Sequence, residues 1–97
     1  MELLQRGHEF EYRDQRGIDR LGQADVYASR RGDRAVLVLR NVDGGPHGNE
    51  RLTLLENARR ALLTLASSLL PFLVPSARLE VLILRPGDQK PRALLLP

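Results

Sequence analysis

Acidic and imidazole side chains are the groups of this sequence best suited to acid–base or metal chemistry. Glu9 and Glu11 alternate with aromatic residues in one segment, and Asp25 lies in a later one. The two histidines, His8 and His47, show no H-x-x-x-H or other ligand spacing. Carboxylates that repeat at every second residue of a strand share one solvated face, so we expect no metal ion and no cofactor at these positions.

Nucleophilic and phosphate-binding motifs do not occur in the sequence either. No serine stands in a G-x-S-x-G context. Residues 43–50, DGGPHGNE, join an expected strand to an expected helix, but they match neither G-x-G-x-x-G nor G-K-[ST]. The chain has no cysteine, which excludes a thiol nucleophile, a thiolate metal site and disulfides. The sequence therefore predicts a protein that is not an enzyme.

Three arginines form the one notable cluster of charge. Arg30, Arg31 and Arg34 surround an expected tight turn, where they could bind phosphates. The 15 basic and 12 acidic residues give a net charge of +3, which neither requires nor excludes an anionic partner. Two Phe, two Tyr and no Trp are too few for a clear base-stacking platform. The cluster is therefore either a solvated turn or a nucleic-acid-binding patch.

Hydrophobic periodicity predicts the first half of the fold. Residues 8–14 and 23–29 alternate in the manner of half-buried strands. Residues 34–42, RAVLVLRNV, contain a continuous apolar run and should pair with 23–29 as a hairpin about the turn 31–33. Residues 1–7 fit either a short strand or a helical turn.

A long helix is expected in the second half of the chain. Asn49 is a suitable N-cap, because its side chain can accept from the free amides of a first helical turn. The helix should end near Leu70, because Pro71 cannot donate to the preceding turn.

Two further strands should follow the helix. Residues 78–85, RLEVLILR, and residues 92–97 predict strands that pair across the turn 86–91. A chain of 97 residues forms a single domain over residues 1–97. The order β-β-β-α-β-β predicts an α+β fold, with a mostly antiparallel sheet and one long amphipathic helix on one face.

The layout of these elements, with Gly22, Asp25 in QADVYA and the apolar strand AVLVLRNV, resembles the restriction-endonuclease-like fold of Holliday-junction resolvases. Over about residues 8–85, that resemblance implies an Asp early in the second strand and a Glu-x-Lys at the end of the third, which would hold Mg²⁺ and position a water molecule. Leu39 stands in the place of the Glu and Asn41 in that of the Lys. The resemblance therefore implies an inactive relative.

The strands are too apolar to be covered by one helix. A helix covers one face of a sheet, whereas the runs AVLVL, LEVLIL and ALLL are largely apolar on both faces. Burying four or five such side chains stabilises by roughly 6–12 kcal/mol at about 25 cal/mol per Å². We expect a homodimer or a protein partner on this surplus surface, unless residues 1–7 fold back over it as a helix. The residues expected at the interface are Leu37, Leu39, Leu63, Leu70, Leu94, Leu95 and Leu96.

The sequence also predicts the cellular compartment of the protein. Its first residues do not resemble a signal peptide. The longest uncharged run, residues 61–77, contains two prolines and is shorter than the about 20 residues of a spanning helix. We expect a cytoplasmic protein-binding or self-associating domain that does not enter membranes. A nucleic-acid-binding domain that uses the arginine hairpin is the alternative.

Overall fold

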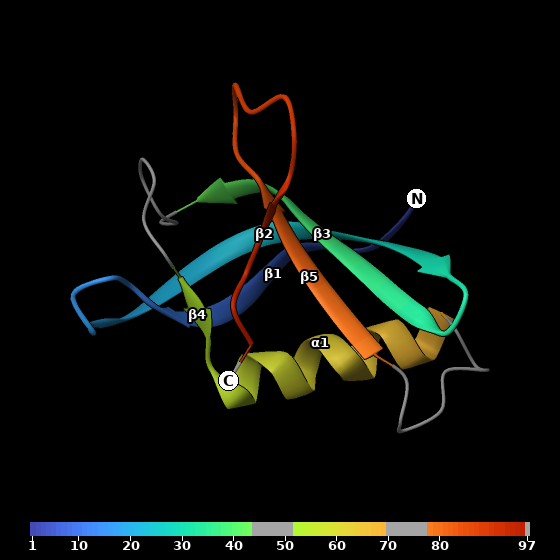
Figure 1. The fold of residues 1–97 in the computed structure, drawn as a ribbon, viewed down its shortest axis with the longest axis horizontal. Helices are drawn as coiled ribbons and strands as arrows, with labels where there is room; N and C mark the ends of the chain where they lie inside the picture. Colours follow the sequence, from blue (N-terminus) through green and yellow to red (C-terminus); the bar gives the residue numbers. More distant parts are fainter. Residues whose placement is uncertain (44–51, 70–77, 97) are drawn as a thin grey trace.

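The computed structural model describes residues 1–43, 52–69 and 78–96, which form a mixed sheet and one helix (Figure 1). The sheet has six strands in the order β4-β1-β2-β3-β5-β6. The strands are β1 (Glu2–Arg13), β2 (Asp19–Arg31), β3 (Arg34–Asp43), β4 (Thr53–Leu54), β5 (Arg78–Leu84) and β6 (Arg92–Ala93). The helix is α1 (Glu56–Leu69). β3 and β5 pair in parallel and the other neighbours are antiparallel. The predicted α+β fold is confirmed.

The β2–β3 hairpin has the predicted position and turn. Gly32 adopts a φ of 61°, a left-handed conformation that favours glycine. β1 is longer than the predicted strand because it starts at Glu2 and pairs with β2 along its length. The first residues therefore extend the sheet, and they do not form a helix over its second face.

The helix is short, and the predicted long helix is wrong. It has 14 residues, and its first hydrogen bond runs from the Arg59 amide to the Leu55 carbonyl at 2.9 Å. Asn49 lies outside the described residues and cannot cap a helix that starts at Glu56. Leu54, which the helical interpretation included, lies in β4 and is fully buried, because its backbone pairs with the sheet.

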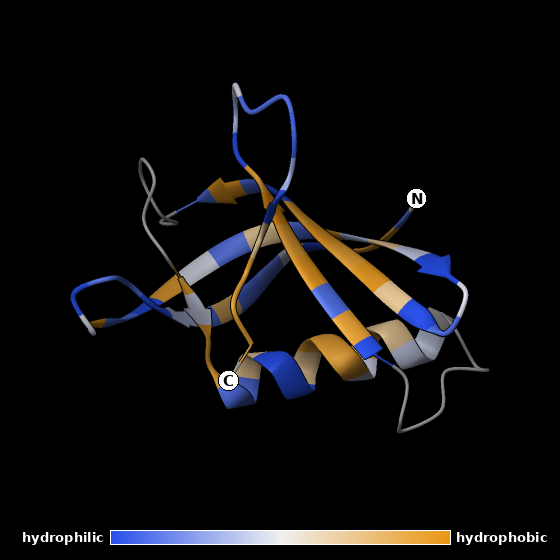
Figure 2. Cartoon of the chain, viewed as in Figure 1, coloured by the Kyte–Doolittle hydropathy of each residue, from blue (hydrophilic) through white to orange (hydrophobic). Residues whose placement is uncertain are grey.

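The core lies between α1 and one face of the sheet. The helix contributes Ala58, Leu62 and Ala66, whose spacing of four residues places them on one stripe. β3 contributes Leu37 and Leu39, both 0% exposed, and Figure 2 shows β3 and β5 hydrophobic along most of their length. These two leucines were expected at an interface. The structure corrects that assignment, because the chain's own helix covers them.

The two edges of the sheet meet through the segment that follows β6. The Leu54 amide donates to the Leu95 carbonyl at 2.9 Å, and the Leu95 amide donates to the Leu52 carbonyl at 3.1 Å. In Figure 1 this last segment runs down past β5 to reach β4. The sheet is therefore curled around the core, with its other face turned outward.

Candidate functional site: the open face of the sheet

The face of the sheet opposite α1, which carries Tyr27, Val38 and Leu82 and is called the open face here, has no described helix over it. Its central feature is an apolar row across five strands. The strand pairings place five residues side by side, namely Leu3, Tyr27, Val38, Leu82 and Ala93. Because paired residues point to the same side of a sheet, these side chains form one continuous band.

The middle of this band, and Val36 in the row beside it, are nearly closed to solvent. Val36 and Val38 are only 4% and 3% exposed, although they point away from the helix. The larger flanking side chains of Tyr27 and Leu82 are half-buried, whereas Leu3 at the outer strand is 40% exposed. The exposed apolar surface is therefore smaller than the sequence suggested, and it lies at the ends of the band.

A row of arginines crosses the open face at one end. Arg31 pairs with Arg34, and Arg34 pairs with Arg78, so three exposed guanidinium groups stand on adjacent strands. Like charges directly opposite each other are unfavourable. Arg34 is compensated by Glu80, whose Oε2 lies 3.6 Å from Nη1 of Arg34. The arginine row therefore concentrates positive charge at this end of the open face, where an anion would be attracted.

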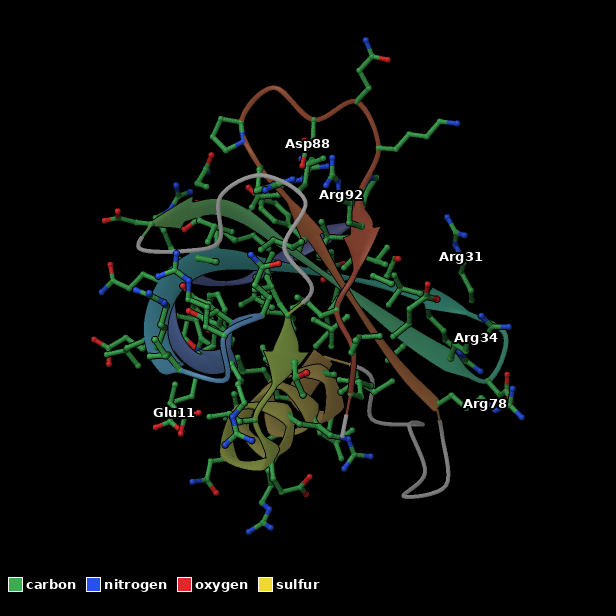
Figure 3. All side chains as sticks on the ribbon, turned by 60° about the vertical axis from the view of Figure 1, so that its left-hand side comes forward. Glu11, Arg31, Arg34, Arg78, Asp88 and Arg92 are labelled. Atoms are coloured by element: carbon green, nitrogen blue, oxygen red, sulfur yellow. The ribbon has the colours of Figure 1, made fainter. Side chains whose placement is uncertain are left out.

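The row differs from the cluster predicted from sequence. Arg31 and Arg34 belong to both, whereas Arg30 alternates onto the other face and donates from Nε to the Gly32 carbonyl at 3.1 Å. Arg78 was missed, because only the parallel register of β3 and β5 brings it beside Arg34. Figure 3 shows Arg31, Arg34 and Arg78 gathered at one end of the molecule, with Glu11 at the opposite end.

An acidic row crosses the far end of the same face. Glu9 pairs with Gln23, and Gln23 pairs with Asp43, and all three side chains are exposed. Between this row and the apolar row lies Arg40, whose guanidinium carbon stands 5.0 Å from the ring centroid of Tyr27. The open face is therefore basic at one end, apolar in the middle and acidic at the other end.

Asp25 is a buried structural group and not a solvated surface carboxylate. Only 8% of the residue is exposed. Its Oδ1 accepts from the Gly7 amide and its Oδ2 accepts from Nδ2 of Asn41, both at 2.9 Å. These hydrogen bonds, that of Asn41 first, lower the pKa of the Asp25 carboxyl below its usual value.

The two partners of Asp25 lie at irregularities in the strands on either side of it. The register of β1 shifts between Gln5 and His8, around Gly7, and that between β2 and β3 shifts opposite Asn41. Asn41 has a φ of 53°, which asparagine tolerates better than most residues. Asp25 thus holds two β-bulges in place, and both of its oxygens are already occupied.

The remaining chemical candidates do not assemble into a site. Among the described residues, no three His, Asp or Glu side chains are grouped closely enough to hold a metal ion. His47 lies outside the described residues. Asp14, which is 7% exposed, accepts from the amides of Arg16 and Ile18 and from Nε of Arg20, so it organises the loop between β1 and β2.

The other leucines expected at an interface fall in different environments. Leu94 is 6% exposed and belongs to the core, Leu63 and Leu96 are half-buried, and Leu95 is 50% exposed. Leu70 lies outside the described residues. A shallow groove of about 380 Å³ adjoins the last segment of the chain and is lined by Arg34, Arg78, Leu79, Glu80, Val81, Leu94, Leu95 and Leu96.

Comparison of the chain with known proteins does not assign it a function, so the functional argument depends on the fold and the open face. No family model, no curated protein and no solved structure matches it. Within the described ranges, no helix has the length and apolar character needed to cross a membrane.

Proposed function

We propose that this chain is a small non-enzymatic domain that self-associates through the open face of its sheet. The apolar row from Leu3 to Ala93 carries the proposal, because it runs in register across five strands with no described helix over it. Apolar side chains that stay partly exposed on a sheet, as Leu3, Tyr27 and Leu82 do, are typical of a protein–protein contact. The proposal places the domain in the cytoplasm, because a chain without cysteines needs no oxidising compartment.

The test is the solution mass of the chain at increasing concentration. Sedimentation equilibrium between about 10 µM and 1 mM covers the affinity range of weak complexes. Leu3→Lys introduces a charge at the exposed end of the apolar row and should shift the protein to monomer. Ile18→Lys is the matched control, because Ile18 is 48% exposed in the loop between β1 and β2. A protein that stays monomeric throughout, or that dissociates equally with both variants, contradicts the proposal.

A second candidate function, nucleic-acid binding, is favoured by the arginine row. Three guanidinium groups on adjacent strands can each contact a phosphate. In this proposal the chain is an inactive relative of the restriction-endonuclease-like proteins that it resembles, with Leu39 and Asn41 in place of the catalytic Glu and Lys.

Fluorescence anisotropy with labelled DNA and RNA oligonucleotides tests this second candidate. Binding should weaken steeply as salt rises, because released counterions drive it. Replacing both Arg31 and Arg34 by Ala should abolish binding, whereas Arg30→Ala should leave most of it, since Arg30 lies on the other face. Equal loss with Arg30→Ala, or retention in the double variant, would exclude the arginine row as the binding surface.

A further inference from the structure

The charges of the open face are arranged so that one copy of the face complements a reversed copy. In β2 the residues of this face are Arg31, Ser29, Tyr27, Asp25 and Gln23, and each stands in one transverse row of the sheet. The apolar row at Tyr27 is the middle of the five. The arginine row and the acidic row lie two rows away on opposite sides, each about 13 Å from the middle at about 3.3 Å per residue.

The two intermediate rows carry opposite charges as well. On the arginine side, Ser29 pairs with Val36, and Val36 pairs with Glu80. On the acidic side, Asp25 pairs with Arg40, and the carboxylate of Asp25 is bound within the chain. Asp25 stays ionised, but it is only 8% exposed, so the charges of these rows that reach the surface are Arg40 on one side and Glu80, loosely paired with Arg34, on the other.

We propose that a second copy of this chain docks face to face on the open face, related by a two-fold axis that runs along the apolar row. This inference rests on the proposed self-association and specifies its geometry. Rotation about such an axis reverses the order of the rows. The arginine row of one copy then meets the acidic row of the other, the row of Glu80 meets that of Arg40, and the apolar rows stack on each other.

Symmetry makes each of these contacts occur twice, as in any isologous interface. Arg34 in β3 faces Asp43 in β3 of the second copy, and the same pair forms on the other side of the axis. A two-fold axis parallel to the strands would instead bring the arginine rows together, so the charges select one of the two face-to-face arrangements. The arrangement also places carboxylates of the second copy beside the crowded arginine row.

The size of the face indicates a weak dimer. Four strands at about 4.8 Å and eight residues at about 3.3 Å cover at most about 19 by 26 Å, and because the sheet curls around the core, two copies touch over only part of this area. This footprint is smaller than the about 800 Å² that each partner buries in a standard interface. Charge pairs at the two ends should therefore account for a measurable share of the affinity, and they should make it dependent on salt.

Charge-reversal variants in sedimentation equilibrium test this geometry. Arg34→Glu should raise the Kd of the dimer about tenfold, and so should Asp43→Arg, because each reverses two symmetric contacts. The combined Arg34→Glu/Asp43→Arg variant should restore the wild-type Kd within about threefold, since the attraction is re-formed with opposite sign. Arg34→Glu should also keep the fold, because it places an acid between Arg31 and Arg78; a thermal melt checks this.

The matched control is Arg60→Glu, which makes the same change on the solvent side of α1, where the side chain is 73% exposed. It should leave the Kd unchanged. Raising NaCl from about 50 to 500 mM should weaken the wild-type dimer severalfold. A dimer insensitive to salt and to both reversals, or one not restored by the combined variant, would overturn this arrangement while leaving self-association standing. A wild-type monomer at every concentration would remove both proposals.

Discussion

Replacing Gly22 by Ala should destabilise the fold through a single contact, that with Phe10. The two residues are cross-strand partners in β1 and β2, and the Phe10 ring lies over the glycine. A Cβ at position 22 would lie 2.9 Å from Cζ and 3.1 Å from Cε1 of that ring. Phe10 is only 2% exposed, so the ring cannot move outward without disturbing the core.

The size of the effect follows from two opposing terms. Crowding an extra methyl group into a packed core costs about 1–3 kcal/mol. Alanine in a strand gains about 0.5–1 kcal/mol over glycine, because glycine loses more conformational freedom on folding. We therefore expect Gly22→Ala to lower the free energy of unfolding by about 1–2 kcal/mol, and to lower the Tm by about 4–8 °C for each kcal/mol.

Urea unfolding at low protein concentration, followed by circular dichroism, measures this change without interference from self-association. Phe10→Leu provides the internal control, because leucine lacks the distal ring carbon that contacts position 22. In the Phe10→Leu background, Gly22→Ala should cost little or even stabilise the protein. An equal cost in both backgrounds, or a wild-type stability for the single variant, would refute the contact as the reason for glycine at this position.

Three further predictions concern hydrogen-bonded carboxylates, a residue with positive φ and the core. Asp14, Asp25 and Asp88 all have pKa values lowered from 3.8, so their stabilising contribution is present above that value and lost as pH falls through their lower folded-state values. Burial lowers the pKa of His8 from 6.5, so the unfolded chain takes up that proton first and urea midpoints should fall modestly as pH drops through about 6.5. The three carboxyls should then make them fall steeply below about pH 4. Asn41→Ala should lower the free energy of unfolding by about 1–2 kcal/mol, because it removes the hydrogen bond to Asp25 and keeps a φ of 53°; a smaller loss in Asn41→Gly would separate the two causes. Leu62→Ala, in the centre of α1 at 0% exposure, should cost about 2–5 kcal/mol by the same measurement, and a cost below 1 kcal/mol would mean that α1 packs loosely.

Local patterns were sufficient to predict the strands that line the core. The alternation around Val26 and the glycine turn at Gly32 led directly to the β2–β3 hairpin. The helix start was mispredicted because Leu54 extends the four-residue spacing of Ala58 and Leu62 backwards, as a helical stripe would, although the two-residue spacing of Leu52 and Leu54 fits a strand. Their backbone hydrogen bonds to Leu95, over 40 positions later, decide in favour of the strand.

The open face could be predicted only in part, because it depends on register. The sequence showed that the strand around Val38 is apolar on both sides. It could not show that Leu3, Tyr27 and Leu82 stand beside Val38, because a shift of one residue would send each to the other face. The pairings of β1 and β3 with β2 also contain register shifts, including one between Leu3 and Gln5. Positive φ angles at Gly7 and Asn41 mark two of these shifts, and such angles cannot be read from the hydrophobic pattern.

The junction of Leu95 with β4 also affects how the chain can fold during synthesis. β1 is synthesised before β4, yet β4 gains its own second partner only when residue 95 has been made. Such distant pairings form slowly, because the chain must lose the conformational entropy of closing a long loop before the contacts between the strands can stabilise it. Until then both margins of the sheet present unpaired amides and carbonyls, which invite pairing with other chains. The nascent domain should therefore be most prone to aggregate before Leu95 emerges and pairs with β4.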